Sequence, residues 1–321
     1  MIKDYNVVIS KDGPALSRRG FGTLVILSHE TDNEFTYIRE LKDIEDLEAP
    51  ELIKKYNAIL KSPYKAEKIA YIGTKEKGVT KALSDNQKRN FFFFTTTGDV
   101  QDALTCITDS TKFDKIFMYT IKNVEDIAVL EEAYKASSSA YLMYHKDDYP
   151  AEILMVMMSI DLSRRNPKDT HLPGVIPSEI TSDERNALED TNIATYEEVM
   201  GVGVVRSSKV GNGEYLDNII GEHFTVVAVE EGVFDVRLKN MKIGYNNEGI
   251  GLLVTGVRNG MERAKGIDFI DDYVVDYKRR EEVPADEVKD RVYNHLHVTA
   301  QYQGAIESGT IRINLTYEGV E

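Results

Sequence analysis

The sequence is poor in residue types on which several classes of protein depend. Its 321 residues include one cysteine, Cys106, and no tryptophan. A single thiol excludes an internal disulfide framework or a thiolate metal cluster, and fits a reducing compartment. No run approaches the roughly 18 uncharged apolar residues of a membrane span, and the N-terminus lacks a signal-peptide pattern. The sequence therefore predicts a cytosolic protein without membrane insertion.

Positive charge is also scarce. The chain has 39 Lys and Arg against 54 Asp and Glu, a formal net charge of -15 at pH 7. Nucleic acids and anionic lipids are normally bound through clustered cations, so neither is an expected partner. Hydrophobic residues make up 42% of the chain, enough for the core of one large domain or two ordinary ones.

Strand and helix patterns alternate through the first half of the chain. This alternation predicts a mainly parallel sheet covered by helices. A proline-rich crossing over residues 166 to 192 follows, with a short helix near 181 to 190. The expected buried strands are 22–29, 68–73, 90–97, 115–121 and 139–145, and the expected helices include 47–62, 98–110, 123–136 and 150–165.

The second half predicts an α+β region. Glycines in 195–218 indicate a hairpin or extended loop, whereas 223–239 fits either a hairpin or a helix. A helix is expected over 247–265 with Gly266 as its C-cap, followed by two strands separated by a turn at 285–291. The expected domains are an N-terminal arm (1–20), an α/β body (21–190), a C-terminal domain (191–306) and a C-terminal strand arm (307–321).

Both ends of the sequence have the period-two alternation of half-buried strands. Each expected strand lies close to an end of the sequence, and its pairing partner is an open question at this point. The apolar positions of these strands are Tyr5, Val7 and Ile9 at one end and Ile311, Ile313 and Leu315 at the other.

Candidate chemical sites are each better explained as core or loop. The segment GVGVVRSSKVGNG (201 to 213) lacks the spacing of a phosphate-binding loop. His295 and His297 share one face of an expected strand, but no third metal ligand accompanies them. Cys106 lies on an apolar helical face, and Phe91 to Phe94 fit a strand buried on both sides. We therefore expect no enzyme activity, no cofactor and no bound metal.

Several motifs together resemble the contractile tail sheath proteins of bacteriophages and related phage-tail-like particles. The motifs are RRGFGTLVILSH (18 to 29) with FTYIRELKDIEDL (35 to 47), NIATYEEV (192 to 199), GEYLDNIIGEHF (213 to 224), KIGYNNEGIGLLVTGVRNGMERAKGIDF (242 to 269) and SGTIRINLTY (308 to 317).

This resemblance implies a structural virion protein. The subunit would polymerise helically around a tail tube and contract to drive the tube through a bacterial envelope, as in genome ejection. Its partners would be copies of itself, the tail tube protein, and the baseplate and tail terminator proteins. It would reside in the virion tail after assembly in the host bacterial cytoplasm.

The resemblance also implies roles for particular segments. The terminal arms of one subunit would add strands to a sheet in its neighbours, with flexible hinges at Asp12-Gly13-Pro14 and from Gln303 to Gly309. The helix at 247–265 would face the tube. Its exposed residues would include Arg258, Glu262, Arg263 and Lys265.

Two other interpretations stay open from the sequence. One is a doubly wound enzyme that binds a nucleotide or small acid at the carboxyl ends of strands near residues 97, 121 and 145. The other is a regulatory module that binds partners through its acidic surface. Although some sheath relatives have a subtilisin-like domain, no Asp, His and Ser set with a nucleophile motif supports proteolysis here.

Overall fold

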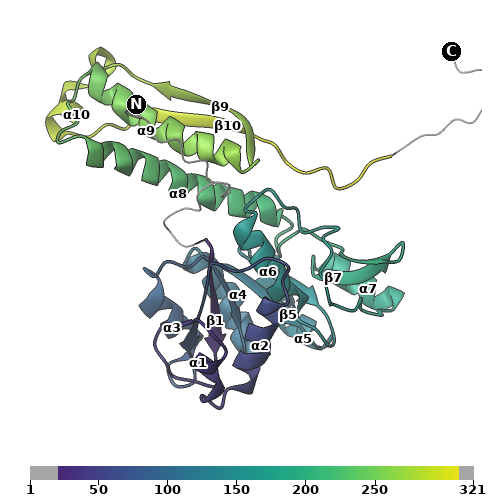
Figure 1. Cartoon of the computed structure of the whole chain (residues 1–321). Helices are drawn as coiled ribbons and strands as arrows, with labels where there is room; N and C mark the ends of the chain where they lie inside the picture. The colour runs from purple at the N-terminus through teal and green to yellow at the C-terminus, as the bar shows by residue number, and fades with distance from the viewer. Residues whose placement is uncertain (1–20, 311–321) are drawn as a thin grey trace, which may run out of the picture.

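A central mixed sheet organises the larger part of the molecule. The structure, a computed structural model, describes residues 21–310. The expected arm strands with Tyr5, Val7, Ile9, Ile311, Ile313 and Leu315 lie outside the described residues. The sheet order is β2-β3-β1-β4-β5-β6-β7-β8. The six strands β3, β1, β4, β5, β6 and β7 run parallel, and the edge strands β2 and β8 are antiparallel to their neighbours. This sheet lies in the lower part of the molecule as drawn in Figure 1. The strands are β1 (Thr23–Ser28), β2 (Thr36–Ile38), β3 (Lys68–Gly73), β4 (Phe93–Thr96), β5 (Ile116–Ile121), β6 (Ala140–Tyr144), β7 (Ala194–Val199) and β8 (Val202–Val205).

Helices cover both faces of this sheet. Successive residues of β1 point to opposite sides, so Leu24 and Ile26 pack with α2 and α6, whereas Val25 and Leu27 pack with α3, α4 and α5. The architecture is doubly wound, and it confirms the predicted mainly parallel, helix-covered sheet. The helices are α1 (Lys42–Glu45), α2 (Pro50–Leu60), α3 (Gly78–Asn86), α4 (Val100–Lys112), α5 (Asp126–Lys135), α6 (Pro150–Ile160) and α7 (Ser182–Asp190).

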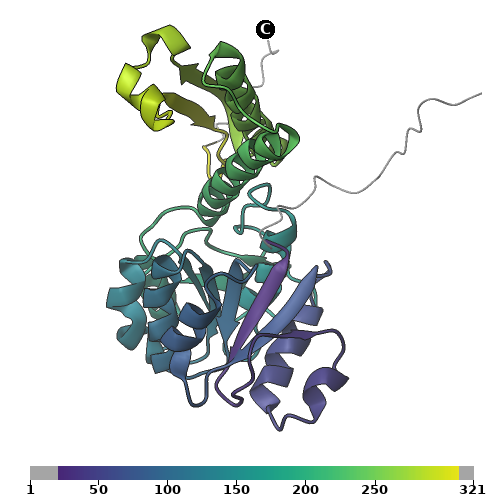
Figure 2. The same ribbon diagram turned by 90° about the vertical axis from the view of Figure 1, so that its left-hand side faces the viewer.

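A helical hairpin with a small sheet projects from this body (Figure 2). The long helix α8 (Leu216–Lys239) leaves the body, α9 (Asn247–Gly266) packs along it, and β9 (Ile270–Tyr277) pairs antiparallel with β10 (Leu296–Tyr302). The connection between the strands contains the 3-10 turn η1 (Arg280–Glu282) and α10 (Ala285–Asp290). None of the described helices has the length and apolar character needed to cross a membrane.

Packing explains why the ambiguous segment 223–239 is helical. Phe224, Ala228, Gly232 and Val236 recur every four residues and are all buried in α8. This spacing places them on one face of a helix, where burial outweighs the β propensity of the valines between them.

Three details differ from the expected boundaries. Residues 285–290 form α10 rather than a turn; the helix follows Pro284 and ends at Arg291, which is left-handed with φ 60°. Helix α9 continues through Gly266, and the left-handed residue after it is Asp268, with φ 59°. Strands β7 and β8 form the hairpin expected within 195–218, and they extend the body sheet beyond residue 190.

Candidate assembly surfaces

The β9–β10 sheet has two strands and is largely exposed. Its two strands pair with each other and with no other strand between residues 21 and 310, so each has an outer edge there. Tyr273 and Val275 pack inward on the core, whereas the intervening Val274 is 58% exposed. Such edges offer unpaired backbone N–H and C=O groups to an incoming strand.

Helix α9 presents only part of its expected charged face to solvent. Arg258 and Glu262 are exposed, and Glu262 accepts a hydrogen bond from the Tyr273 hydroxyl at 2.7 Å. Arg263 instead turns toward α8, where it forms a 2.8 Å ion pair with Glu231. Lys265 lies 3.4 Å from Asp272 on β9. The free outer surface of α9 therefore centres on Arg258.

The hydrogen bond from Tyr273 to Glu262 joins the β9–β10 sheet to α9, and it requires a protonated phenol. Burial first, and then the hydrogen bond to the Glu262 carboxylate, raise the pKa of Tyr273 to about 12. The phenol therefore keeps its proton across the physiological range and continues to donate to Glu262.

Helices α8 and α9 approach so closely that glycine is required at their contact. A Cβ at Gly256 would come within 2.9 Å of the Gly232 carbonyl oxygen, and one at Gly260 would overlap the backbone of Val229. Because backbone atoms cannot rotate away, these positions hold the two helices as one rigid pair. The pair is the support on which the β9–β10 sheet lies.

The histidine pair expected as a possible metal site belongs to this sheet region. His295 Nε2 lies 3.1 Å from Glu287 Oε2 of α10, and His297 on β10 is exposed opposite Asp276. Among the described residues no group of three or more His, Cys, Asp or Glu is placed to hold a metal ion. His295, the residue before β10, is thus placed against Glu287 of α10.

Several polar groups at the carboxyl ends of the body strands bond within the protein, whereas the buried hydroxyls of Ser28, Thr31 and Thr74 have no hydrogen-bond partner among the described residues. His29 Nδ1 lies 2.8 Å from Thr97 Oγ1 at the point where strand order reverses between β1 and β4. The Thr120 hydroxyl donates to Glu152 at 2.6 Å, and His145 Nε2 lies 2.8 Å from the Ile176 carbonyl. These contacts satisfy some of the polar groups at the edge of the sheet where a nucleotide was expected.

Buried groups elsewhere in the body also have structural roles. Lys55 and Glu152 form a buried ion pair, and Glu152 also accepts from the Thr95 hydroxyl at 3.0 Å. Phe91 to Phe94 are all buried in the core. Burial raises the pKa of the Cys106 thiol well above its usual range, so the reactive thiolate is suppressed.

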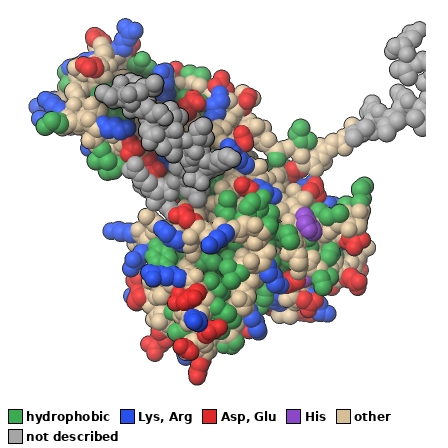
Figure 3. All heavy atoms as spheres, in the orientation of Figure 1, with side chains coloured by type: hydrophobic (Ala, Val, Ile, Leu, Met, Phe, Trp, Pro, Cys, Tyr) green, Lys and Arg blue, Asp and Glu red, His purple; other side chains and the backbone are tan. Residues whose placement is uncertain are grey.

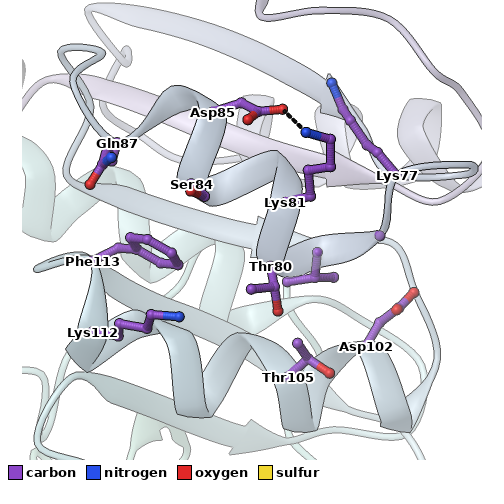
Figure 4. A pocket seen from close by; sticks show the side chains of 12 residues that line it. Lys77, Thr80, Lys81, Ser84, Asp85, Gln87, Asp102, Thr105, Lys112 and Phe113 are labelled. Carbon is purple, nitrogen blue, oxygen red and sulfur yellow. Dashed lines mark ion pairs between the residues drawn. The ribbon is translucent and has the colours of Figure 1, made fainter.

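A groove of about 650 Å³ lies between α3 and α4 (Figure 4). Lys77, Lys81 and Lys112 line it together with Asp85 and Asp102. Lys81 pairs with Asp85 at 3.3 Å and Lys77 with Glu34 at 3.4 Å. Two of the lysines that line the groove thus already have carboxylate partners. On the face of the molecule drawn in Figure 3, positive and negative side chains are likewise mixed.

Comparison with known proteins reveals likeness in structure rather than in sequence. No family model matches the sequence, and no curated protein matches it. A chain in the six-fold symmetrised structure of the anti-feeding prophage baseplate superposes with a TM-score of 0.71 at 10% identity, covering 98% of this chain and 100% of that one. The chain therefore shares its fold with this baseplate chain.

Two further structures are similar to the chain. The sheath complex of an extracellular contractile injection system, in its contracted state, gives a TM-score of 0.64 at 11% identity and covers 99% of each chain. A sheath tail protein from Listeria innocua gives a TM-score of 0.51 at 8% identity, covering 88% of this chain and 96% of that one. The likeness thus extends over both the body and the projecting hairpin.

Proposed function

We propose that this chain is the structural subunit of a contractile tail sheath. It polymerises helically around a tail tube and contracts to drive the tube through a bacterial envelope. The observation that supports this most is the likeness, over nearly the whole chain, to a sheath complex of a contractile injection system. Its partners would be further copies of itself, the tube protein, and the baseplate and terminator proteins. It would assemble in the bacterial cytoplasm and reside in the tail.

The β9–β10 sheet is the proposed acceptor of strands from neighbouring subunits. Its outer strand edges, unpaired within residues 21–310, can extend the sheet through backbone hydrogen bonds. The proposed donors are the N-terminal strand at Tyr5 to Ile9 and the C-terminal strand at Ile311 to Leu315. Repeated from subunit to subunit, this heterologous contact builds an open helix.

The outer surface of α9 is the proposed contact with the tube. Arg258 is its exposed cation, and Glu262 lies one turn further along the helix. Binding through exposed charges is screened by salt, so attachment to the tube should weaken as ionic strength rises.

Negative-stain electron microscopy of the purified protein, alone and with its tube protein, tests the proposal. We expect long helical polymers, or sheaths around tubes. A protein that stays monomeric in both samples and binds a small molecule saturably would instead favour the doubly wound enzyme.

A further inference from the structure

The segment that follows β10 returns to the α/β body and is fastened there by one side chain. The Glu307 carboxylate accepts a hydrogen bond from Asn166 Nδ2 at 2.7 Å and another from the Ser208 hydroxyl. Lys168 Nζ donates to the Glu307 carbonyl at 2.9 Å and lies 3.9 Å from its carboxylate. Donors from two separate loops of the body thus converge on a single residue.

The rest of this segment makes few contacts that would hold it. Residues 303–306 are exposed, and Ile306, the apolar residue next to Glu307, is 98% exposed. The Gln303 amide donates to the Phe269 carbonyl at 3.0 Å, at the end nearest β10. Apolar burial therefore does not attach the segment to the body, and the polar contacts of Glu307 are its main fastening.

The fastened segment also covers a buried carboxylate. Gln303, Gly304 and Ala305 line a cavity of about 260 Å³ together with Asp217, at the start of α8. Asp217 is only 5% exposed, and its Oδ1 has no hydrogen-bond partner within the described chain. The segment thus lies beside the junction at which α8 leaves the body.

We propose that Asn166, Lys168 and Ser208 form a carboxylate-binding site on the body, whose ligand is Glu307 of the same chain. The site fixes the point from which the C-terminal arm departs. The expected hinge from Gln303 to Gly309 is therefore not free along its length, because it is pinned at Glu307.

The consequence concerns how far the arm reaches, and it rests on the proposed sheath function. Four residues, 303 to 306, lie between the last residue of β10 and Glu307. An extended chain spans about 3.3–3.6 Å per residue, so a released Glu307 can lie anywhere up to roughly 16–18 Å from Tyr302. A pinned Glu307 gives the arm one defined starting point, and release lets that starting point move.

Hydrogen-exchange mass spectrometry of the full chain tests the site without requiring sheath formation. The Gln303 amide donates to the Phe269 carbonyl beside β10, so freeing the segment beyond it by Glu307→Ala should accelerate exchange in peptides that contain Gln303 by about tenfold or more. Lys168→Ala removes the donor to the Glu307 carbonyl and should accelerate exchange in the same peptides. Ile306→Ala is the matched control and should leave exchange unchanged.

Each outcome decides the matter. Unchanged exchange in Glu307→Ala and Lys168→Ala, or equal acceleration in Ile306→Ala, would overturn the proposal. Sedimentation of every sample checks that the variants have the same assembly state. Failure of the unmodified protein to form sheaths would contradict the proposed function but would leave the exchange result, and thus the Glu307 site, standing.

Discussion

Gly260 on α9 faces the backbone of Val229 on α8 with no room for a side chain between them. The contact fixes the spacing of the helix pair on which the β9–β10 sheet lies. The packing of this region therefore requires a residue without a side chain at position 260.

Substitution of Gly260 by alanine should destabilise the protein, and Gly251 offers a matched comparison. A Cβ at Gly251, in the same helix, meets no atom within 4 Å. Both changes gain up to about 1 kcal/mol of helix propensity. Only Gly260→Ala forces overpacking, so its free energy of unfolding should fall below that of Gly251→Ala by about 1–3 kcal/mol. Urea unfolding measures both; equal stabilities would show that the helices separate without cost.

The two arginines of α9 should behave differently on substitution. Arg263→Ala removes one ion-pair partner of Glu231 and a cation lying 5.4 Å from the Phe224 ring centre, so we expect a loss of about 1–3 kcal/mol of stability. Exposed Arg258 should tolerate Arg258→Glu within about 0.5 kcal/mol. The same Arg258→Glu should weaken co-sedimentation with tubes at low salt. Unchanged co-sedimentation would remove α9 from the tube contact.

Asp217 should make stability depend on pH. Burial, with a smaller contribution from the Glu307 charge, raises the pKa of Asp217 to about 6 from a usual 3.8. The folded state therefore holds the proton more tightly than the unfolded state does. This favourable contribution is complete below about pH 4 and is lost as pH rises through about 6.

The variant Asp217→Asn isolates this contribution. It should be more stable than the unmodified protein at pH 7 by on the order of 2–3 kcal/mol, and of similar stability near pH 3.5. Chemical unfolding at both pH values measures the difference. A stability difference that does not vary with pH would show that Asp217 does not titrate in this way.

The sequence predicted elements whose signals are local. Continuous apolar runs such as Leu24 to Leu27 and Phe91 to Phe94 predict strands buried on both faces. All eight residues are buried, although β4 begins only at Phe93. The segment 223–239 was ambiguous because its valines favour strands, and the burial of Ala228 and Gly232 against α9 depends on tertiary packing that periodicity alone does not settle.

Contacts between side chains that are distant in the sequence could not be predicted from sequence patterns. The sheath resemblance grouped Arg263 with Arg258 on the exposed face of the helix, but Glu231, on a different helix, turns Arg263 inward. Glu307 belonged to the expected free arm, whereas Asn166 and Ser208 bind it to the body from positions 141 and 99 residues away in the chain. Nothing in the local sequence around Glu307 signals these contacts.

The most direct test of strand exchange between subunits is truncation after Thr310. This change removes the proposed strand with Ile311, Ile313 and Leu315 and leaves Glu307 and every described element in place. A lost strand forfeits several backbone hydrogen bonds of about 0.5–1.5 kcal/mol each, repeated at every subunit of the helix. Circular dichroism, sedimentation and electron microscopy of the truncated protein should therefore find a folded monomer that forms no ordered sheath. Ordered sheaths built from the truncated chain, or an unfolded or aggregated product, would contradict strand exchange.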